Sequence, residues 1–425
     1  MKKMKMFTLA LLLSGVFQFA NAQKSKEIIG YFPSWQMYKR NGLFVPEYVD
    51  YSKYSILNYS FYCPDKQGNL QGTDAWADSI LLKGKIDWSK PQPAYYPNSS
   101  LVDFSHLWGV KIMVSIGGWT LSDNFPSIAA DPKKRAHFAA ECVRLIKEYQ
   151  FDGIDIDWEY PGYDEHSGTK DDRKNYPLFM KAIRDSIDAY GKTVNTQFLL
   201  TGAFGANTPQ MDNIDWANVQ FMDYFNMMTY DFNGVWSDDA NHNSPLYNPA
   251  KGYKGSVDEA FRLMTQTYKV PAEKLNLGVA FYGRTLRGFD GDEPITVYRT
   301  GHQKKADDVI FAEWEGSPSY YNIVEEIKKH GYKEYWDDVA QVPYLVSEQE
   351  KSFVTYDNPK SIRLKAEYIV NKKCAGAIIW DASCDYMEKK QGSTLIAGTP
   401  LLDQLNEVFY GNALPVRPRI KKRWK

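Results

Sequence analysis

FDGIDIDWEYPG, residues 151–162, is the stretch that decides how this chain folds and what it does. It places Asp152, Asp155, Asp157 and Glu159 in an otherwise apolar, β-branched run. Side chains alternate between the two faces of a β-strand, so a strand here puts Asp155, Asp157 and Glu159 on one face. Neighbouring like charges and burial both raise carboxyl pKa values, and this favours acid–base catalysis over a purely structural use.

Short β-rich apolar runs recur on both sides of this stretch, separated by segments long enough for helices. Counting the acidic stretch, they lie at 27–33, 54–62, 110–116, 151–162, 197–203, 220–228, 275–281 and 375–381. Apolar residues at helical spacing occur between them, for example over 132–149 and 176–190. Eight strands alternating with helices predict an α/β fold, a (β/α)8 TIM barrel. An open doubly wound sheet is the alternative, but its glycine-rich phosphate turn is not found.

Two connections are too long for simple loops. Residues 63–100 follow the second predicted strand and are expected to form a wall or lid at the barrel mouth; a disordered surface loop is the alternative. Residues 286–355 lie between the seventh and eighth strands and combine a helical pattern at 321–330 with the strand-like pieces YKEYWDD and VPYLV. They predict a small α+β insertion domain. The catalytic barrel then comprises residues 23–285 and 356–411, and a basic tail occupies 412–425.

The N-terminus predicts export. Lys2, Lys3 and Lys5 precede an apolar run over 6–19, and Ala20-Asn21-Ala22 follows at once. This order is typical of a signal peptide over residues 1–22, cleaved before Gln23, and the apolar run is short for a membrane anchor. We therefore expect a secreted protein, extracellular or periplasmic, with no stable membrane insertion after cleavage.

Composition restricts the class of partner. The formal net charge of −1 and an apolar fraction of 44% give no indication of nucleic-acid binding. The 30 tyrosines and 12 tryptophans suit either a large core or a cleft that stacks sugar rings. Cys63, Cys142, Cys374 and Cys384 are scattered, so disulfides and buried free thiols both stay open. The histidines form no paired ligand motif with them, and we expect no metal and no other cofactor.

The position of the three acids along one predicted strand also indicates how they would act in catalysis. Catalytic groups of a TIM barrel sit at the carboxyl ends of its strands, so Glu159 is expected at the rim, with Asp157 and Asp155 deeper. A rim acid kept protonated by its neighbours suits protonation of a leaving group. An ordinary retaining glycosidase needs two carboxylates about 5–5.5 Å apart across the scissile bond. Three acids along one strand do not supply that pair, so the second group comes from another strand or from the substrate.

DGIDIDWE fits the DxxDxDxE signature of glycoside hydrolase family 18, the chitinases and their relatives. Ser115–Gly118 resembles the family's SxGG, Met228–Asp231 its MxYD, and Trp380 its strand-end tryptophan. Further similar landmarks are Tyr31–Trp35, Phe281–Arg284 and Val354–Asp357. The resemblance runs from about Glu27 to Phe409, and the insertion resembles the α+β domain of the deep-cleft chitinase subgroup.

The resemblance implies a role for each matching residue. Glu159 is implied as the general acid and base, Asp157 as the residue that orients the substrate acetamido group, Asp155 as its proton-sharing neighbour, and Tyr230 as a further positioning group. The substrate's own N-acetyl oxygen is the implied nucleophile, giving an oxazolinium ion. The implied substrate-binding residues are Trp380, Tyr31, Phe61, Gly118, Trp119, Met228, Asp231, Tyr282 and Arg284. For Phe61 and Met228 plain barrel core is the alternative, for Gly118 tight packing, and Asp152 is expected to be structural.

These expectations favour a secreted, monomeric chitinase that hydrolyses β-1,4-linked N-acetylglucosamine polymers with retention. Its implied partners are chitin or N-acetylglucosamine oligosaccharides. An endo-β-N-acetylglucosaminidase acting on N-glycans is the alternative enzyme, and a non-catalytic, lectin-like chitin-binding protein is the alternative outside catalysis. Such binding relatives usually lack the catalytic acid, which is present here as Glu159.

Overall fold

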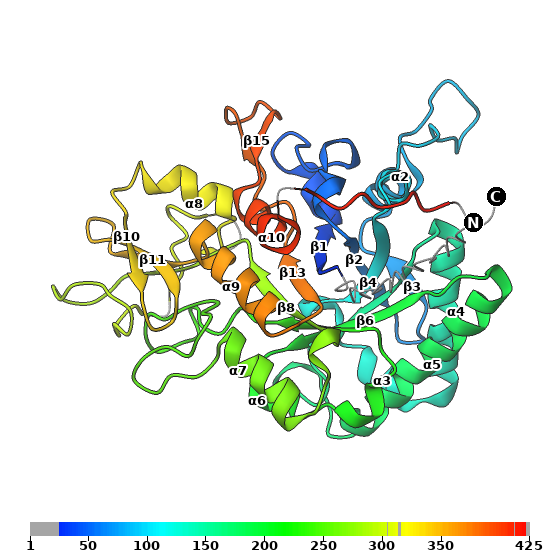
Figure 1. Cartoon of the computed structure of the whole chain (residues 1–425), viewed down its shortest axis with the longest axis horizontal. Coiled ribbons are helices and arrows are strands. Elements are labelled where there is room, and N and C mark those ends of the chain that lie inside the picture. The colour runs from blue at the N-terminus through cyan, green and yellow to red at the C-terminus, as the bar shows by residue number, and fades with distance from the viewer. Residues whose placement is uncertain (1–24, 304, 313–315, 412, 422–425) are drawn as a thin grey trace, which may run out of the picture.

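A computed structural model describes residues 25–303, 305–312, 316–411 and 413–421, so the predicted signal peptide lies outside the described residues. Eight parallel strands surround the centre of the molecule (Figure 1): β1 (Glu27–Pro33), β2 (Ile56–Pro64), β4 (Lys111–Gly117), β5 (Gly153–Asp157), β6 (Leu199–Gly205), β7 (Tyr224–Met228), β8 (Leu275–Ala280) and β13 (Gly376–Trp380). Their order is β1-β13-β8-β7-β6-β5-β4-β2, and β2 pairs again with β1, which closes the barrel. The predicted TIM barrel is confirmed, with the acidic strand as its fourth.

Helices cover the outside of the barrel. They are α1 (Ala75–Asp78), α2 (Leu101–Leu107), α3 (Phe125–Ala130), α4 (Pro132–Tyr149), α5 (Asp172–Val194), α6 (Thr208–Met211), α7 (Val257–Arg262), α9 (Pro359–Asn371) and α10 (Pro400–Tyr410). The sequence explains the ends of α4, because the Asp131 side chain caps the first N–H groups and Pro132 takes the first helical position. Its last turn ends at Gln150, which adopts a left-handed conformation.

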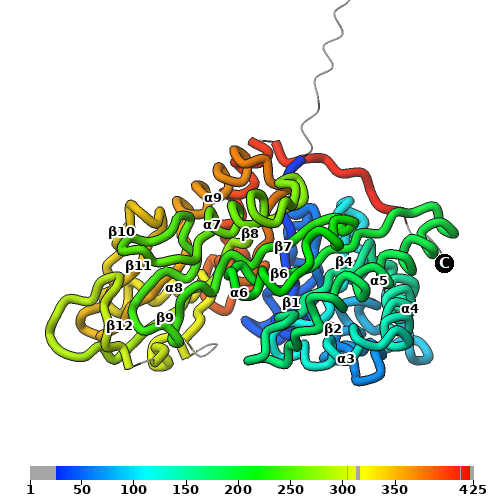
Figure 2. Tube along the Cα trace, turned by 90° about the horizontal axis from the view of Figure 1, so that it is seen from below, coloured from blue at the N-terminus to red at the C-terminus, as the bar shows by residue number. Residues whose placement is uncertain are grey.

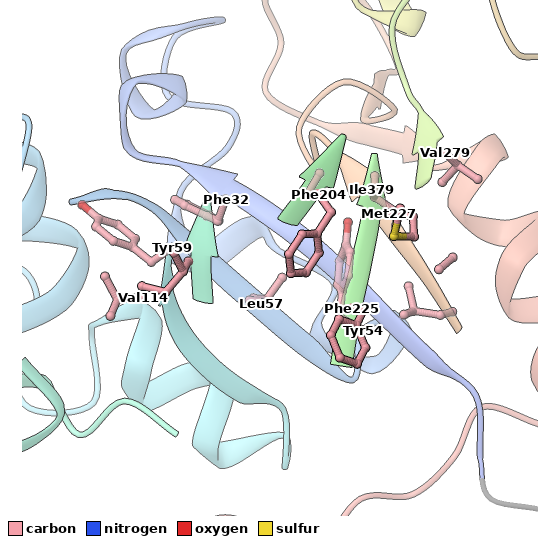
Figure 3. Packing of buried hydrophobic residues seen from close by; sticks show 14 of the residues in the cluster. Phe32, Tyr54, Leu57, Tyr59, Val114, Phe204, Phe225, Met227, Val279 and Ile379 are labelled. Carbon is pink, nitrogen blue, oxygen red and sulfur yellow. The ribbon is translucent and has the colours of Figure 1, made fainter. Parts of the chain in front are cut away.

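Apolar side chains fill two layers. Residues that point outward from the strands, such as Phe32, Leu57 and Val114, pack beneath the helices in one large buried cluster (Figure 3). Residues that point inward, such as Ile29 and Met113, form a second cluster inside the barrel. Because strand side chains alternate between faces, each buried strand contributes to both layers.

Between β8 and β13 the chain forms a second sheet. This antiparallel sheet has the order β10-β11-β12-β9 and lies to one side of the barrel, with α8 beside it (Figures 1 and 2). The elements are β9 (Arg284–Arg287), α8 (Tyr320–Ile327), β10 (Lys333–Asp337), β11 (Val342–Ser347) and β12 (Ser352–Thr355). It has a small core of its own, which includes Leu286, Phe289 and Phe353.

The long segment after β2 is folded onto the barrel edge. Its first part forms β3 (Leu70–Gly72), which pairs antiparallel with β2. The backbone of Leu70 is held by α4, where Glu141 accepts from its N–H at 3.2 Å and Arg144 donates to its oxygen at 2.8 Å. The expected wall or lid role of residues 63–100 stays a prediction.

Other segments complete the outside of the molecule. A short hairpin, β14 (Met387–Glu388) with β15 (Ile396–Gly398), follows β13. The tail residue Ile420 donates its N–H to the oxygen of His106 in α2. All four cysteines are free thiols, and three of them are buried. In the described ranges we find no helix with the length and apolarity needed to cross a membrane.

Candidate active site

The acidic strand arranges its carboxyl groups by depth. Asp155 and Asp157 lie within β5, and Glu159 follows two residues beyond its carboxyl end. Asp155 is fully buried, Asp157 is buried with 3% of its surface exposed, and Glu159 is half-buried. The expected order from barrel interior to rim is therefore present. Asp152 lies apart: its Oδ2 accepts from the Ile112 N–H at 2.8 Å, so it joins β5 to β4.

Asp155 is surrounded by hydrogen-bond donors from four other strands. Its Oδ2 accepts from the Tyr31 hydroxyl and the Ser115 hydroxyl, each at 2.8 Å. Its Oδ1 accepts from the Thr201 hydroxyl and from Asn226 Nδ2, the latter at 3.1 Å. Burial raises the pKa of Asp155, and these hydrogen bonds oppose that rise. The barrel thus fixes this carboxyl group in one orientation.

Asp157 lies above Asp155 in a different environment. Burial, and then the negative charges of Glu159 and Asp155, raise its pKa well above the usual range. Its Oδ1 accepts no hydrogen bond from any described residue. A buried carboxylate oxygen without a partner is costly, so this atom is suited to accept a hydrogen bond from a substrate N–H.

Glu159 combines partial access with a raised pKa. Burial, reinforced by the negative charge of Asp231, raises the pKa of Glu159 to about 7, while hydrogen bonds from Tyr160 and the Trp119 backbone N–H oppose the rise. A carboxyl group with this pKa is partly protonated at neutral pH and can both donate and accept a proton.

Two residues that the sequence motifs did not reveal hold the main chain of Glu159. The N–H of Glu159 donates to Ser122 Oγ at 3.0 Å, and Ser122 donates to the Gly118 oxygen at 2.9 Å. On the other side, His166 Nδ1 lies 2.9 Å from the Glu159 oxygen. Ser122 lies four residues beyond the SxGG pattern, and the position of His166 depends on loop conformation, so neither carried a motif signal.

Aromatic rings form the floor of the barrel mouth. Trp380 ends β13, and its ring stacks with Phe61 at a centroid distance of 5.8 Å. The Tyr31 ring meets Trp380 edge-on at 5.6 Å, and Trp35 lies 6.4 Å from it. Non-proline cis peptide bonds occur at Ser60–Phe61, Glu159–Tyr160 and Trp380–Asp381.

The glycine pair after β4 allows a close approach to this floor. Gly118 has a φ of +96°, and a Cβ at this position would lie 2.9 Å from the Phe61 ring. At Gly117 a Cβ would lie 2.1 Å from the Asp157 oxygen. Both positions therefore require glycine. The next residue, Trp119, projects from the rim with 51% of its surface exposed.

Polar groups beyond β7 join the barrel to the insertion. Asp231 Oδ1 accepts from the Tyr282 hydroxyl at 2.6 Å and from Arg284 Nε at 2.9 Å. The ring of Tyr230 packs against Tyr282 at 6.1 Å, with Met228 buried in the same barrel-lining cluster. Since Arg284 begins β9, this network fixes the insertion against the ends of β7 and β8.

All the predicted site residues are therefore found at one end of the barrel. A pocket beside Trp380 includes Trp35 of the Tyr31–Trp35 landmark and adds residues that no motif indicated, chiefly Gln36, Ser317, Ser319 and Asp381. Within the described ranges no cluster of three or more histidine, cysteine, aspartate or glutamate side chains could hold a metal ion.

Comparisons with known proteins agree with this arrangement. The family model of glycosyl hydrolases family 18 matches residues 27–385. Chitinase A1 of Niallia circulans is 34% identical over 409 residues, which cover 86% of this chain and 57% of that protein, so the chain spans little more than half of it. Endochitinase 1 of Metarhizium robertsii is 31% identical, with coverages of 87% and 83%. The solved chitinase ChiA74 from Bacillus thuringiensis superimposes with a TM-score of 0.81 at 30% identity, over 93% of this chain and 71% of that chain.

Proposed function

Because the chain belongs to family 18 of the glycosyl hydrolases, we propose that it is a chitinase that hydrolyses β-1,4-linked N-acetylglucosamine polymers. The observation that carries this proposal is the unpartnered Asp157 Oδ1 beside Glu159, whose pKa is about 7. Together they offer an acceptor for an acetamido N–H and a proton donor for a glycosidic oxygen. The chitinase names of the two relatives support the same substrate.

In the first step, Glu159 donates its proton to the glycosidic oxygen as the bond from that oxygen to the anomeric carbon breaks. The carbonyl oxygen of the substrate's own N-acetyl group forms a bond to the same carbon. The product is an oxazolinium ion, and the leaving sugar departs with the proton of Glu159. Family 18 is a known exception to the two-carboxylate scheme, so no second protein nucleophile is required.

Asp157 and Tyr230 act on the acetamido group during this step. The nitrogen becomes positive as the ring closes, and the Asp157 carboxylate accepts its N–H and stabilises that charge. Tyr230 positions the acetamido group from the end of β7, two strands away from β5. Asp155 shares a proton with Asp157, and its four hydrogen-bond donors hold it in place for that exchange.

In the second step, the Glu159 carboxylate takes a proton from water, and the resulting hydroxide equivalent attacks the anomeric carbon and opens the oxazolinium ring. Two inversions at one carbon give net retention. The Trp380 floor carries the distorted sugar on its apolar ring face, with Tyr31, Phe61 and Met228 around it.

Members of this family differ in the products that they release, so the products of this enzyme have to be measured. A solved family 18 N-acetylglucosaminidase from Paenibacillus barengoltzii has a TM-score of 0.73 at 26% identity, over 90% of this chain and 99% of that chain. Ser317 and Ser319 of the insertion line the pocket beside Trp380, and the insertion resembles the α+β domain of the deep-cleft chitinases, which is the reason for preferring a linear polymer to an N-glycan. We also propose that the protein is secreted and that its signal peptide is cleaved before Gln23. N-terminal sequencing of the exported protein tests this, and a mature protein that retains Lys2 would contradict it.

The proposed function is tested by replacing Glu159 with Gln and following hydrolysis of chitohexaose and colloidal chitin, with an N-glycoprotein as the control substrate. We expect activity on both chitin substrates to fall about a thousandfold, the middle of the range that a general acid–base contributes. Binding of chitohexaose should persist, because the fold and the aromatic floor are unchanged. Release of glycan from the N-glycoprotein without cleavage of chitohexaose would contradict the chitinase proposal.

A further inference from the structure

The imidazole of His166 lies flat against the indole of Trp119. Their ring centroids are 3.9 Å apart and their planes differ by 5°. Trp119 follows the glycine pair at the end of β4, and His166 lies in the loop that follows β5. The contact therefore joins two rim segments that lie next to each other through the β4–β5 pair. Trp119 remains 51% exposed although His166 stacks on it, and its second ring neighbour, Tyr160, lies 6.2 Å away at a tilt of 57°.

The same imidazole also holds the main chain of Glu159. Its Nδ1 lies 2.9 Å from the Glu159 oxygen, and a carbonyl oxygen only accepts, so Nδ1 carries a hydrogen and donates it. One side chain thus contacts both the exposed indole and the residue proposed to transfer the proton.

The loop that carries His166 is closed by its own hydrogen bonds. The buried Asp172 side chain accepts from the Gly162 N–H at 3.0 Å and from the Thr169 N–H at 2.6 Å, at the two ends of the loop. Inside it, the Tyr163 oxygen accepts from the N–H groups of His166 and Gly168 at 3.1 and 2.8 Å. These bonds fix the backbone position from which the imidazole projects.

We propose that His166 is a positioning residue that fixes the Trp119 indole relative to Glu159. An N-acetylglucosamine ring stacked on the exposed part of the indole is then held at a set distance from the acid. This inference rests on the proposed function, since it assumes a chitin chain as the ligand. It assigns His166 no contact with the substrate.

The two contacts of His166 can be removed separately. His166→Asn keeps a donor close to the Glu159 oxygen but removes the ring, whereas His166→Phe keeps the ring and removes the donor. In the otherwise unaltered enzyme, we expect His166→Asn mainly to raise KM for chitohexaose and His166→Phe mainly to lower kcat. A purely structural role would change both parameters alike in the two variants. His166→Gln provides a second ring-free variant should the Asn substitution unfold the loop.

A double-mutant cycle tests the coupling directly. Binding of chitohexaose is measured by calorimetry in the Glu159→Gln background, where turnover does not interfere. We expect His166→Asn to weaken binding about fivefold when Trp119 is present, the size of one aromatic pair, and to have no further effect after Trp119→Ala. His137→Ala is the matched control, because it removes an exposed histidine of α4 whose Nε2 contacts Asn69, and it should leave binding unchanged.

Equal losses with and without Trp119, or no loss in either case, would overturn the positioning role while leaving the chitinase proposal intact. Failure of the Glu159→Gln parent to bind chitohexaose at all would instead overturn the proposed function, and this inference with it.

Discussion

At the residue scale, burial controls the chemistry of Glu159. The same desolvation that raises its pKa to about 7 also makes it a proton donor near neutral pH. Because the first step needs the protonated form, we expect kcat/KM for chitohexaose to fall as the pH rises through about 7. The measurement is a pH–rate profile from pH 5 to 9, with protein stability verified at each point.

A variant at Asp231 tests whether Glu159 is the group that titrates in this profile. The negative charge of Asp231 contributes to the raised pKa of Glu159. Asp231→Asn should move the alkaline limb to lower pH, whatever its effect on the absolute rate. A flat profile up to pH 9, or a limb that moves to higher pH, would show that Glu159 is not the titrating acid.

The raised pKa also predicts a stability effect of Glu159→Gln. A carboxyl group whose pKa is higher in the folded state than its ordinary value of 4.5 binds a proton more tightly when folded. Its ionisation therefore costs stability increasingly as the pH rises between those two values, and the cost is fully present above the folded pKa. Glutamine removes this cost.

We accordingly expect Glu159→Gln to have a higher Tm than the parent protein at pH 8, and the difference to shrink towards pH 4, as measured by differential scanning calorimetry. Glu273→Gln, at an exposed glutamate, should show no such pH-dependent difference. An equal Tm for parent and Glu159→Gln at pH 8 would mean that Glu159 is not destabilised by burial.

At the scale of elements, the network around Asp231 links β7, β8 and β9. Arg284 Nε donates to Asp231 Oδ1 at 2.9 Å, and the Nη2 of the same guanidinium lies 2.7 Å from that oxygen as an ion pair. Lysine offers a single ammonium group and does not reproduce this fork. We expect Arg284→Lys to raise KM for chitohexaose about tenfold, the effect of roughly one lost charge-assisted hydrogen bond, with a smaller change in kcat.

Arg363→Lys is the matched control, because Arg363 forms comparable ion pairs with Glu367 and Glu407 on the exposed surface of α9 and α10. Its kinetics should match those of the parent enzyme. If Arg284→Lys also matched the parent, the network would not contribute to substrate binding.

The elements also show what the sequence could predict. Alternation of side chains predicted three acids on one strand face, of which Asp155 and Asp157 lie on β5 and Glu159 just beyond it, and helical spacing predicted α4 over 132–149. Local patterns carry this information because it depends only on neighbours along the chain. The short strands β3, β14 and β15 were not predicted, since two- and three-residue strands depend on their pairing partner.

In the active site, too, some features could be predicted from the sequence and others only from the structure. Motif spacing brought the acids, Tyr230 and Trp380 together, but not the partners of each oxygen atom. Asp155 has four hydrogen-bond donors, whereas Asp157 Oδ1 has none. This difference depends on how the neighbouring strands are aligned with β5, which the sequence pattern does not contain. The stack of His166 on Trp119 joins residues distant in sequence through a loop conformation, for which no periodic pattern exists.

At the scale of the whole molecule, the barrel supplies the acids and the floor, and the insertion supplies part of the pocket wall. Trp380 of the barrel and Ser317 of the insertion line the same pocket. Asp155 and Asp157 lie on β5 and Glu159 lies just beyond its end, so all three acids come from one strand position of the barrel, which suits a substrate that brings its own nucleophile. A substrate that supplies its own nucleophile determines both the stereochemistry of the product and the acetamido group that the substrate must carry.

Time-resolved proton NMR of chitohexaose hydrolysis tests that claim most directly, with fully deacetylated chitosan as a matched polymer that lacks the acetamido group. We expect newly formed reducing ends to appear first as the β-anomer, and the deacetylated polymer not to be cleaved. An α-anomer as the first product, or cleavage of deacetylated chitosan at a comparable rate, would contradict it.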